Sequence, residues 1–148
     1  MNSRFLFALI LLVTLSVASA IQFEERDTNR KDCTKFTKCK GGNVPSVKVS
    51  LTPDPLKPQK NSKFTVSGKV TSKITSGFVF VSFLNKNKEE RGFDFIPILK
   101  TNADHSFSVN KTIQSPASKQ DMVAVVVKVL NYKDDHHSIL LACAEASP

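Results

Sequence analysis

The sequence predicts an all-β protein, an immunoglobulin-like β-sandwich of about seven antiparallel strands. Short segments in which apolar and polar residues alternate recur along most of the chain, and residues typical of turns separate them. Outside the N-terminal 20 residues, no stretch of ten residues has a convincing helical period. The composition, 41% hydrophobic and 23% charged, excludes a disordered protein, and the length of 148 residues accommodates one domain.

The N-terminal segment, residues 1–20, is predicted to be a cleaved secretory signal peptide. Arg4 precedes an apolar run over residues 5–13, which leads to the small residues Ala-Ser-Ala at 18–20. The run is shorter than the roughly 20 apolar residues of a membrane-spanning helix. An uncleaved anchor is the alternative that this pattern leaves open.

The polar segment that follows, residues 21–38, is predicted to be a flexible lead-in because it has no helical or strand period. Residues 39–148 are then a single domain. Export predicts an extracellular location, or the lumen of a vacuole or lysosome. In the oxidising secretory pathway, Cys33, Cys39 and Cys143 allow one disulfide and leave one thiol.

Seven strands are expected in the domain. In the first, Val47, Val49 and Leu51 alternate with polar residues. Three prolines over residues 53–58 end it, because proline cannot donate to the hydrogen-bond ladder of a sheet. The predicted strands cover residues 47–51, 63–71, 77–84, 92–99, 106–113, 122–130 and 138–144.

Two of these strands, around residues 78–84 and 123–127, are apolar on both faces. Each is therefore either a central strand covered on both sides or part of the wall of an apolar cavity. Phe is abundant, Tyr132 is the only Tyr and Trp is absent. This composition suits a hydrocarbon ligand, although ordinary packing explains it equally well.

A set of motifs along residues 39–145 is shared with a known family. The match rests on Cys39, the strand that ends in Pro53-Asp54-Pro55, the turn at Lys57-Pro58, the strand that ends near Gly68, and the closing segments Val125–Val129 and Leu140–Cys143. This pattern resembles the ML lipid-recognition domain, whose family includes fungal phosphatidylglycerol/phosphatidylinositol transfer proteins and the small soluble Niemann-Pick type C sterol carrier. The chain departs from the family pattern near residues 93–98, which contain no cysteine, and at Gln59, where Gly is common.

The resemblance implies a disulfide between Cys39 and Cys143 that joins the first and last strands of the sandwich. A Cys33–Cys143 bridge is the competing pairing. The resemblance also implies a lipid cavity between the inner faces of the two sheets. The expected lipid-binding wall residues are Val66, Phe78, Phe80, Phe95, Phe107, Val109, Val125 and Val127.

The function that the resemblance implies is the binding and transfer of a phospholipid or sterol without chemistry. One alternative is a lipid-sensing co-receptor or secreted effector that acts through a protein partner. Another is a plain immunoglobulin-like interaction domain with a filled core. We expect a monomer that is not an enzyme and has no cofactor.

The chain is basic, with 21 Lys and Arg against 13 Asp and Glu and a formal net charge of +8. Lysines gather over residues 57–73 and 86–88, where they form either a solvated face or a transient contact with an anionic membrane surface. Export of the protein argues against a nucleic-acid partner.

His105, His136 and His137 are the only histidines, and two of them lie in the segment Asp-Asp-His-His at 134–137. Adjacent residues of a strand point to opposite faces, so this segment predicts a polar hairpin tip rather than a metal or catalytic site. Asn110-Lys111-Thr112 is an N-glycosylation sequon, which makes Asn110 a candidate acceptor.

Overall fold

The computed structural model describes residues 35–40, 43–134 and 137–146. The predicted signal peptide, most of the predicted lead-in and Cys33 lie outside the described residues. Within the described ranges, no helix is long and apolar enough to span a membrane.

Strands dominate the described chain. The elements are β1 (Thr37–Lys38), β2 (Lys48–Thr52), β3 (Asn61–Lys69), β4 (Gly77–Leu84), β5 (Glu90–Ile98), β6 (Ser106–Gln114), the short 3₁₀ helix η1 (Lys119–Asp121), β7 (Ala124–Asp134) and β8 (His137–Ala146). The seven predicted strands are confirmed, and β4 matches its predicted bounds. The additional strand β1 lies within the last two residues of the segment predicted to be a lead-in.

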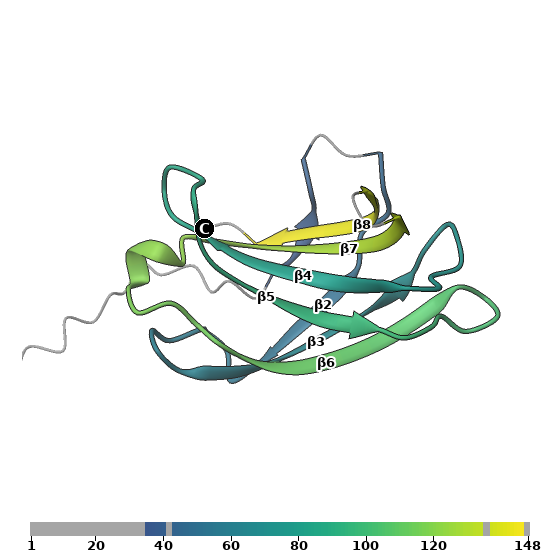
Figure 1. Cartoon of the computed structure of the whole chain (residues 1–148). Helices are drawn as coiled ribbons and strands as arrows, with labels where there is room; N and C mark the ends of the chain where they lie inside the picture. Colours follow the sequence, from purple (N-terminus) through teal and green to yellow (C-terminus); the bar gives the residue numbers. More distant parts are fainter. Residues whose placement is uncertain (1–34, 41–42, 135–136, 147–148) are drawn as a thin grey trace, which may run out of the picture. The chain divides into compact units, whose positions relative to one another are not determined.

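The strands form two antiparallel sheets (Figure 1). One has five strands in the order β1-β8-β7-β4-β5, and the other has three in the order β2-β3-β6. This arrangement confirms the predicted all-β sandwich. Strands β5 and β6 are the edge strands on one side of the two sheets, and β4 lies between β7 and β5.

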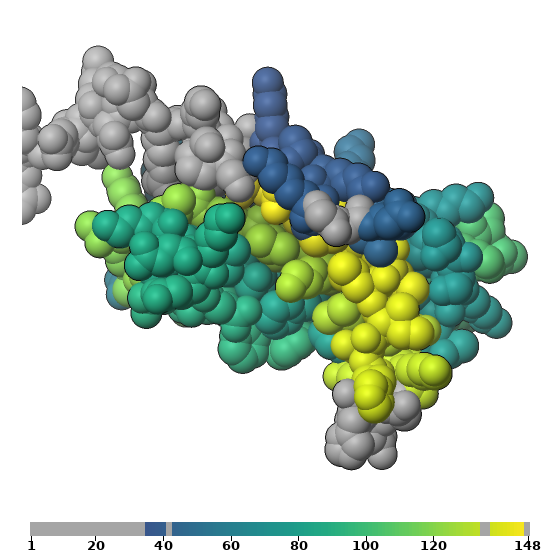
Figure 2. Space-filling view, turned by 90° about the horizontal axis from the view of Figure 1, so that it is seen from above, coloured from purple at the N-terminus to yellow at the C-terminus, as the bar shows by residue number. Residues whose placement is uncertain are grey.

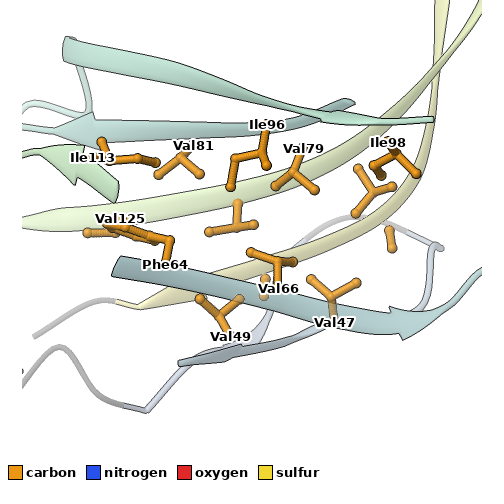
Figure 3. Close-up of a cluster of buried hydrophobic side chains, with 14 of the residues drawn as sticks. Val47, Val49, Phe64, Val66, Val79, Val81, Ile96, Ile98, Ile113 and Val125 are labelled. Atoms are coloured by element: carbon orange, nitrogen blue, oxygen red, sulfur yellow. The ribbon is translucent and has the colours of Figure 1, made fainter. Parts of the chain in front are cut away.

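The core lies between the sheets and follows the two-residue period of the strands. Phe64 and Val66 of β3 point inward from the three-stranded sheet, and Val79 and Val81 of β4 point inward from the five-stranded sheet (Figure 3). These four residues and Phe83, also of β4, are 0–1% exposed. The rings of Phe64 and Phe83 meet edge to face, with centroids 6.2 Å apart. Apolar burial therefore joins the two sheets.

The disulfide joins Cys39 to Cys143 of β8, with the two Cα atoms 5.5 Å apart. The structure thus confirms the pairing that the family resemblance implies and excludes a Cys33–Cys143 bridge, since Cys143 is already bonded. Next to the bridge, β1 pairs with β8 and the Cys143 amide donates to the Pro45 carbonyl. Figure 2 shows the segment from residue 35 onward, in blue, lying against the yellow β8.

We predict that Cys143→Ala lowers the free energy of unfolding by roughly 4 kcal/mol, because the bridge closes a loop with a sequence separation of 104. Neither remaining cysteine can then restore a bridge to β8. Urea unfolding of the secreted chain measures the change, and Cys33→Ala is the matched control, with an expected change below about 1 kcal/mol. Equal losses in both variants would contradict the prediction.

Candidate functional site

The eight residues predicted to line a lipid cavity do not all face the space between the two sheets. Five point into the space between the sheets: Val66, Phe107, Val109, Val125 and Val127. Four of these five are at most 5% exposed, and Val109 is partly buried against the core. Phe78, Phe80 and Phe95 instead lie on the outer face of the five-stranded sheet, because they alternate with inward-facing core residues.

An aromatic cluster covers part of this outer face. It consists of Phe78 and Phe80 of β4, Phe93 and Phe95 of β5, and Tyr132 of β7, and is called the aromatic face below. The strand register brings it together: Phe80 is directly opposite Phe95, and Phe93 is opposite Ser82, the next outward position on β4.

Phe95 is the centre of the cluster. Its ring centroid lies 5.0 Å from that of Phe78, 5.1 Å from Phe80 and 5.4 Å from Phe93. Tyr132 packs on the other side of Phe78 at 5.1 Å. Ring pairs at these separations contribute about 0.5–1.5 kcal/mol each beyond their buried area, so the rings hold one another in a continuous surface.

The aromatic face remains open to solvent even though its rings touch. Phe93 is 56% exposed, Phe95 43% and Tyr132 50%. Single exposed apolar residues are ordinary in a soluble protein, but a contiguous apolar patch marks a surface for an apolar partner. This clustering, rather than any single ring, makes the aromatic face a candidate binding site.

A pocket of about 410 Å³ opens beside the aromatic face. It is lined by Thr75, Ser76, Gly77, Phe78, Phe95, Pro97, Ile98, Leu99 and Tyr132. Leu99 is 86% exposed, whereas Ile98 belongs to the core. The pocket therefore borders both the solvent-exposed rings and a core residue, beside the start of β4.

Glycine is required at position 77, where β4 begins beside this pocket. A Cβ atom there would lie 2.5 Å from the Leu130 carbonyl oxygen and 2.7 Å from Cγ2 of Ile74. A larger residue would push β4 away from β7 and so separate the rings of Phe78 and Tyr132, which belong to these two strands.

The outer face of the three-stranded sheet has a different chemistry. By the strand alternation its outward positions are Lys48, Ser50 and Thr52 of β2, Lys63, Thr65, Ser67 and Lys69 of β3, and Ser108, Asn110 and Thr112 of β6. Hydroxyl, amide and lysine side chains thus occupy the positions that aromatic rings occupy on the other sheet. Asn110 is exposed on this polar face, so its side chain is accessible for the predicted glycosylation.

Basic side chains accompany the aromatic face. Lys128 of β7 is directly beside Phe80 in the register of β4 and β7. At the β5 edge, Lys111 Nζ donates to Asp94 Oδ1 at 2.7 Å and to the Phe95 carbonyl at 3.0 Å, so the carboxylate there is paired. Lys100, which is exposed, follows Leu99 in the chain. On the same face, Glu145 of β8 lies farther out, opposite Val126.

The free edge of β5 is capped by side chains. The Phe95 amide donates to Asp94 Oδ1 at 2.7 Å, and Lys111 occupies the Phe95 carbonyl. Pro97, two residues further along the same edge, has no backbone N–H and cannot donate a hydrogen bond to an added strand. These features block the addition of another strand, a common way for sheet proteins to protect their edges. A partner therefore approaches over the rings rather than along the edge.

The turn before β6 has one carboxyl group whose pKa is shifted. Hydrogen bonds from the Ser106 hydroxyl, at 2.6 Å, and from the Ser106 amide, at 3.1 Å, hold the pKa of Asp104 below its ordinary value. Within the described ranges, no group of three His, Cys, Asp or Glu side chains is placed to hold a metal ion. Part of the predicted hairpin tip, Asp135 and His136, lies outside the described residues.

Comparisons of the chain with models of protein families, with curated proteins and with solved structures give no match. The geometry of the site therefore carries the functional argument.

Sequence reasoning missed three members of this region: Phe93, Leu99 and Tyr132. The signal for Phe93 was present, because it shares the strand phase of Phe95 two residues later. Tyr132 comes from a distant strand and meets Phe78 only through the β4–β7 register, which no local pattern predicts.

We predict that Phe93→Ser lowers the free energy of unfolding by about 1–2 kcal/mol, because the ring contacts Phe80 and Phe95 but is mostly exposed. The matched control is Phe83→Ala on the inner face, which empties a site that is 1% exposed and costs about 3–5 kcal/mol. Denaturant unfolding of both variants measures the contrast. A loss for Phe93→Ser as large as that for Phe83→Ala would make the aromatic face a structural element.

We also predict that Lys111→Ala leaves stability within about 1 kcal/mol, as expected for an exposed ion pair, but increases self-association by uncovering the β5 edge. Light scattering coupled to size-exclusion chromatography measures the mass distribution. Lys63→Ala, on the polar face, is the control. Identical elution of the two variants would show that Lys111 does not protect the edge.

Proposed function

We propose that the protein binds an amphipathic lipid, a phospholipid or a sterol, and carries it without chemistry through an extracellular or endomembrane compartment. The observation that carries this proposal is the exposed aromatic face with its adjoining apolar pocket. The resemblance to the ML lipid-recognition domain and the predicted signal peptide support it independently.

The pocket has the size and lining of a small-ligand site. Its volume of about 410 Å³ falls within the range typical of ligand pockets, and most of its lining is apolar. Each methylene group that leaves water contributes about 0.8 kcal/mol, so a hydrocarbon tail gains free energy without any specific polar contact. The few polar groups at the rim, such as Ser76 and the Tyr132 hydroxyl, suit the polar end of the same ligand.

The outer pocket is a better first contact for a lipid tail than the space between the sheets. Val66, Val125 and Val127 are 0% exposed, so a tail between the sheets would have to displace packed core side chains. Phe78, Phe95 and Leu99 are already accessible. We therefore place initial lipid binding at the outer pocket, with any deeper insertion depending on separation of the sheets.

A second function, recognition of a protein partner, is favoured by one observation. Exposed Phe and Tyr side chains are enriched in protein interfaces as well as at lipid sites. A lipid-sensing co-receptor, a secreted effector or an immunoglobulin-like interaction domain would each use such a surface.

Native mass spectrometry of the secreted protein, followed by solvent extraction, tests lipid binding. We predict a stoichiometric adduct of a phospholipid or sterol, and its loss in Leu99→Asp, which places a charge at the mouth of the pocket. Ser108→Asp, an exposed position on the polar face, is the control and should retain the adduct. A clean apo mass that also takes up no added phospholipid or sterol would reject the carrier function.

A further inference from the structure

We propose that the aromatic face is a membrane-docking surface that seats the protein on a bilayer containing anionic lipid. This inference deepens the proposed function, on which it rests, by naming the surface from which the lipid would be taken. It concerns the face of the five-stranded sheet, not the lysine-rich segments that the sequence singled out.

In the described part of the chain, the exposed aromatic side chains are confined to one outer face. The rings of Phe93, Phe95 and Tyr132 are each roughly half exposed, while the described outer face of the other sheet presents Ser, Thr, Asn and Lys. Tyr132 favours the boundary between water and lipid, where its apolar ring and its hydroxyl are both satisfied, whereas the phenylalanine rings gain free energy by leaving water for the apolar layer. Leu99, 86% exposed, projects from the same end.

The lysines near the aromatic face complement the charge of anionic lipid headgroups. Lys128 extends from the strand position beside Phe80, and long lysine side chains place their methylenes along apolar surface while the ammonium reaches water or headgroups. Lys100, which is exposed, follows the pocket residue Leu99 in the chain. At the β5 edge Lys111 pairs with Asp94, the residue before Phe95, and Glu145 of the same face lies farther out, on β8. Rings bordered by lysines match an apolar layer covered by anionic headgroups.

A protein partner and a second copy of this chain fit the aromatic face less well than a bilayer does. The capped β5 edge disfavours a partner, including a second copy of this chain, that pairs by strand addition. A second copy seated face to face would bring the lysines of both copies together, which like-charge repulsion opposes. An anionic bilayer has neither difficulty, because its headgroups are the opposite charge and it needs no matching strand.

The molecule contains its own probe for this test. Tyr132 is the only Tyr and Trp is absent, so the intrinsic tyrosine emission of the whole chain comes from the aromatic face. Vesicles whose acyl chains carry bromine quench a fluorophore only when it reaches the lipid. Quenching of Tyr132 therefore reports docking by this face rather than by any other.

The experiment uses the full secreted chain with vesicles of phosphatidylcholine alone and of phosphatidylcholine with 30% phosphatidylglycerol, each with and without brominated chains. We expect sedimentation with the anionic vesicles at least tenfold stronger than with the neutral ones, quenching of Tyr132, and weakening in 0.5 M salt. Lys128→Gln should weaken binding about fivefold, and Phe93→Ser with Leu99→Ser at least tenfold. Lys63→Gln on the polar face is the matched control and should bind as the parent chain does.

Four outcomes overturn the proposal: no binding to anionic vesicles, binding without quenching of Tyr132, equal weakening by Lys63→Gln and Lys128→Gln, or a dimer in light scattering that Phe93→Ser dissociates. The lipid adduct in mass spectrometry is read separately. Docking without an adduct supports this inference and rejects the carrier function, whereas an adduct without docking does the reverse.

Discussion

Burial of apolar side chains between the two sheets is the interaction on which the rest of the structure depends. Phe64 and Phe83 meet across the interface, and the valines of β3, β4 and β7 fill the space around them. This packing fixes the phase of β4, because an inward Val79 and Val81 force Phe78 and Phe80 outward. The aromatic face is therefore a geometric consequence of the core, although its rings contribute little to that core.

Local periodicity was sufficient to predict the strands in which apolar and polar residues alternate, because each of these buries one face. Val47, Val49 and Leu51 alternate with polar residues before the first proline, and the structure has β2 there, at Lys48–Thr52 instead of residues 47–51. β1 has only two residues, and its pairing with β8 is a long-range contact that no period reveals. The Cys39–Cys143 bridge followed from the family resemblance and not from the spacing of the three cysteines.

The candidate site was harder to predict, and β4 shows why. Its residues are apolar in both phases, so the pattern alone does not tell which face each phenylalanine occupies. The predicted cavity wall therefore combined Phe78, Phe80 and Phe95 with Val66 and Val127. In the structure the three phenylalanines lie on the outer face of the five-stranded sheet, and the two valines lie between the sheets. The register of β4 with β5 and β7 decides the cluster, and that register depends on contacts between distant parts of the chain.

The different chemistry of the two outer faces bears on how many apolar surfaces one molecule can contact at a time. In the part of the chain that the structure describes, rings gather on the five-stranded sheet, while the three-stranded sheet presents hydroxyl, amide and ammonium groups. A molecule with one apolar contact surface engages one apolar surface at a time, and its opposite side stays hydrated. A molecule docked through the aromatic face, as proposed, would contact one bilayer at a time and would not cross-link two of them.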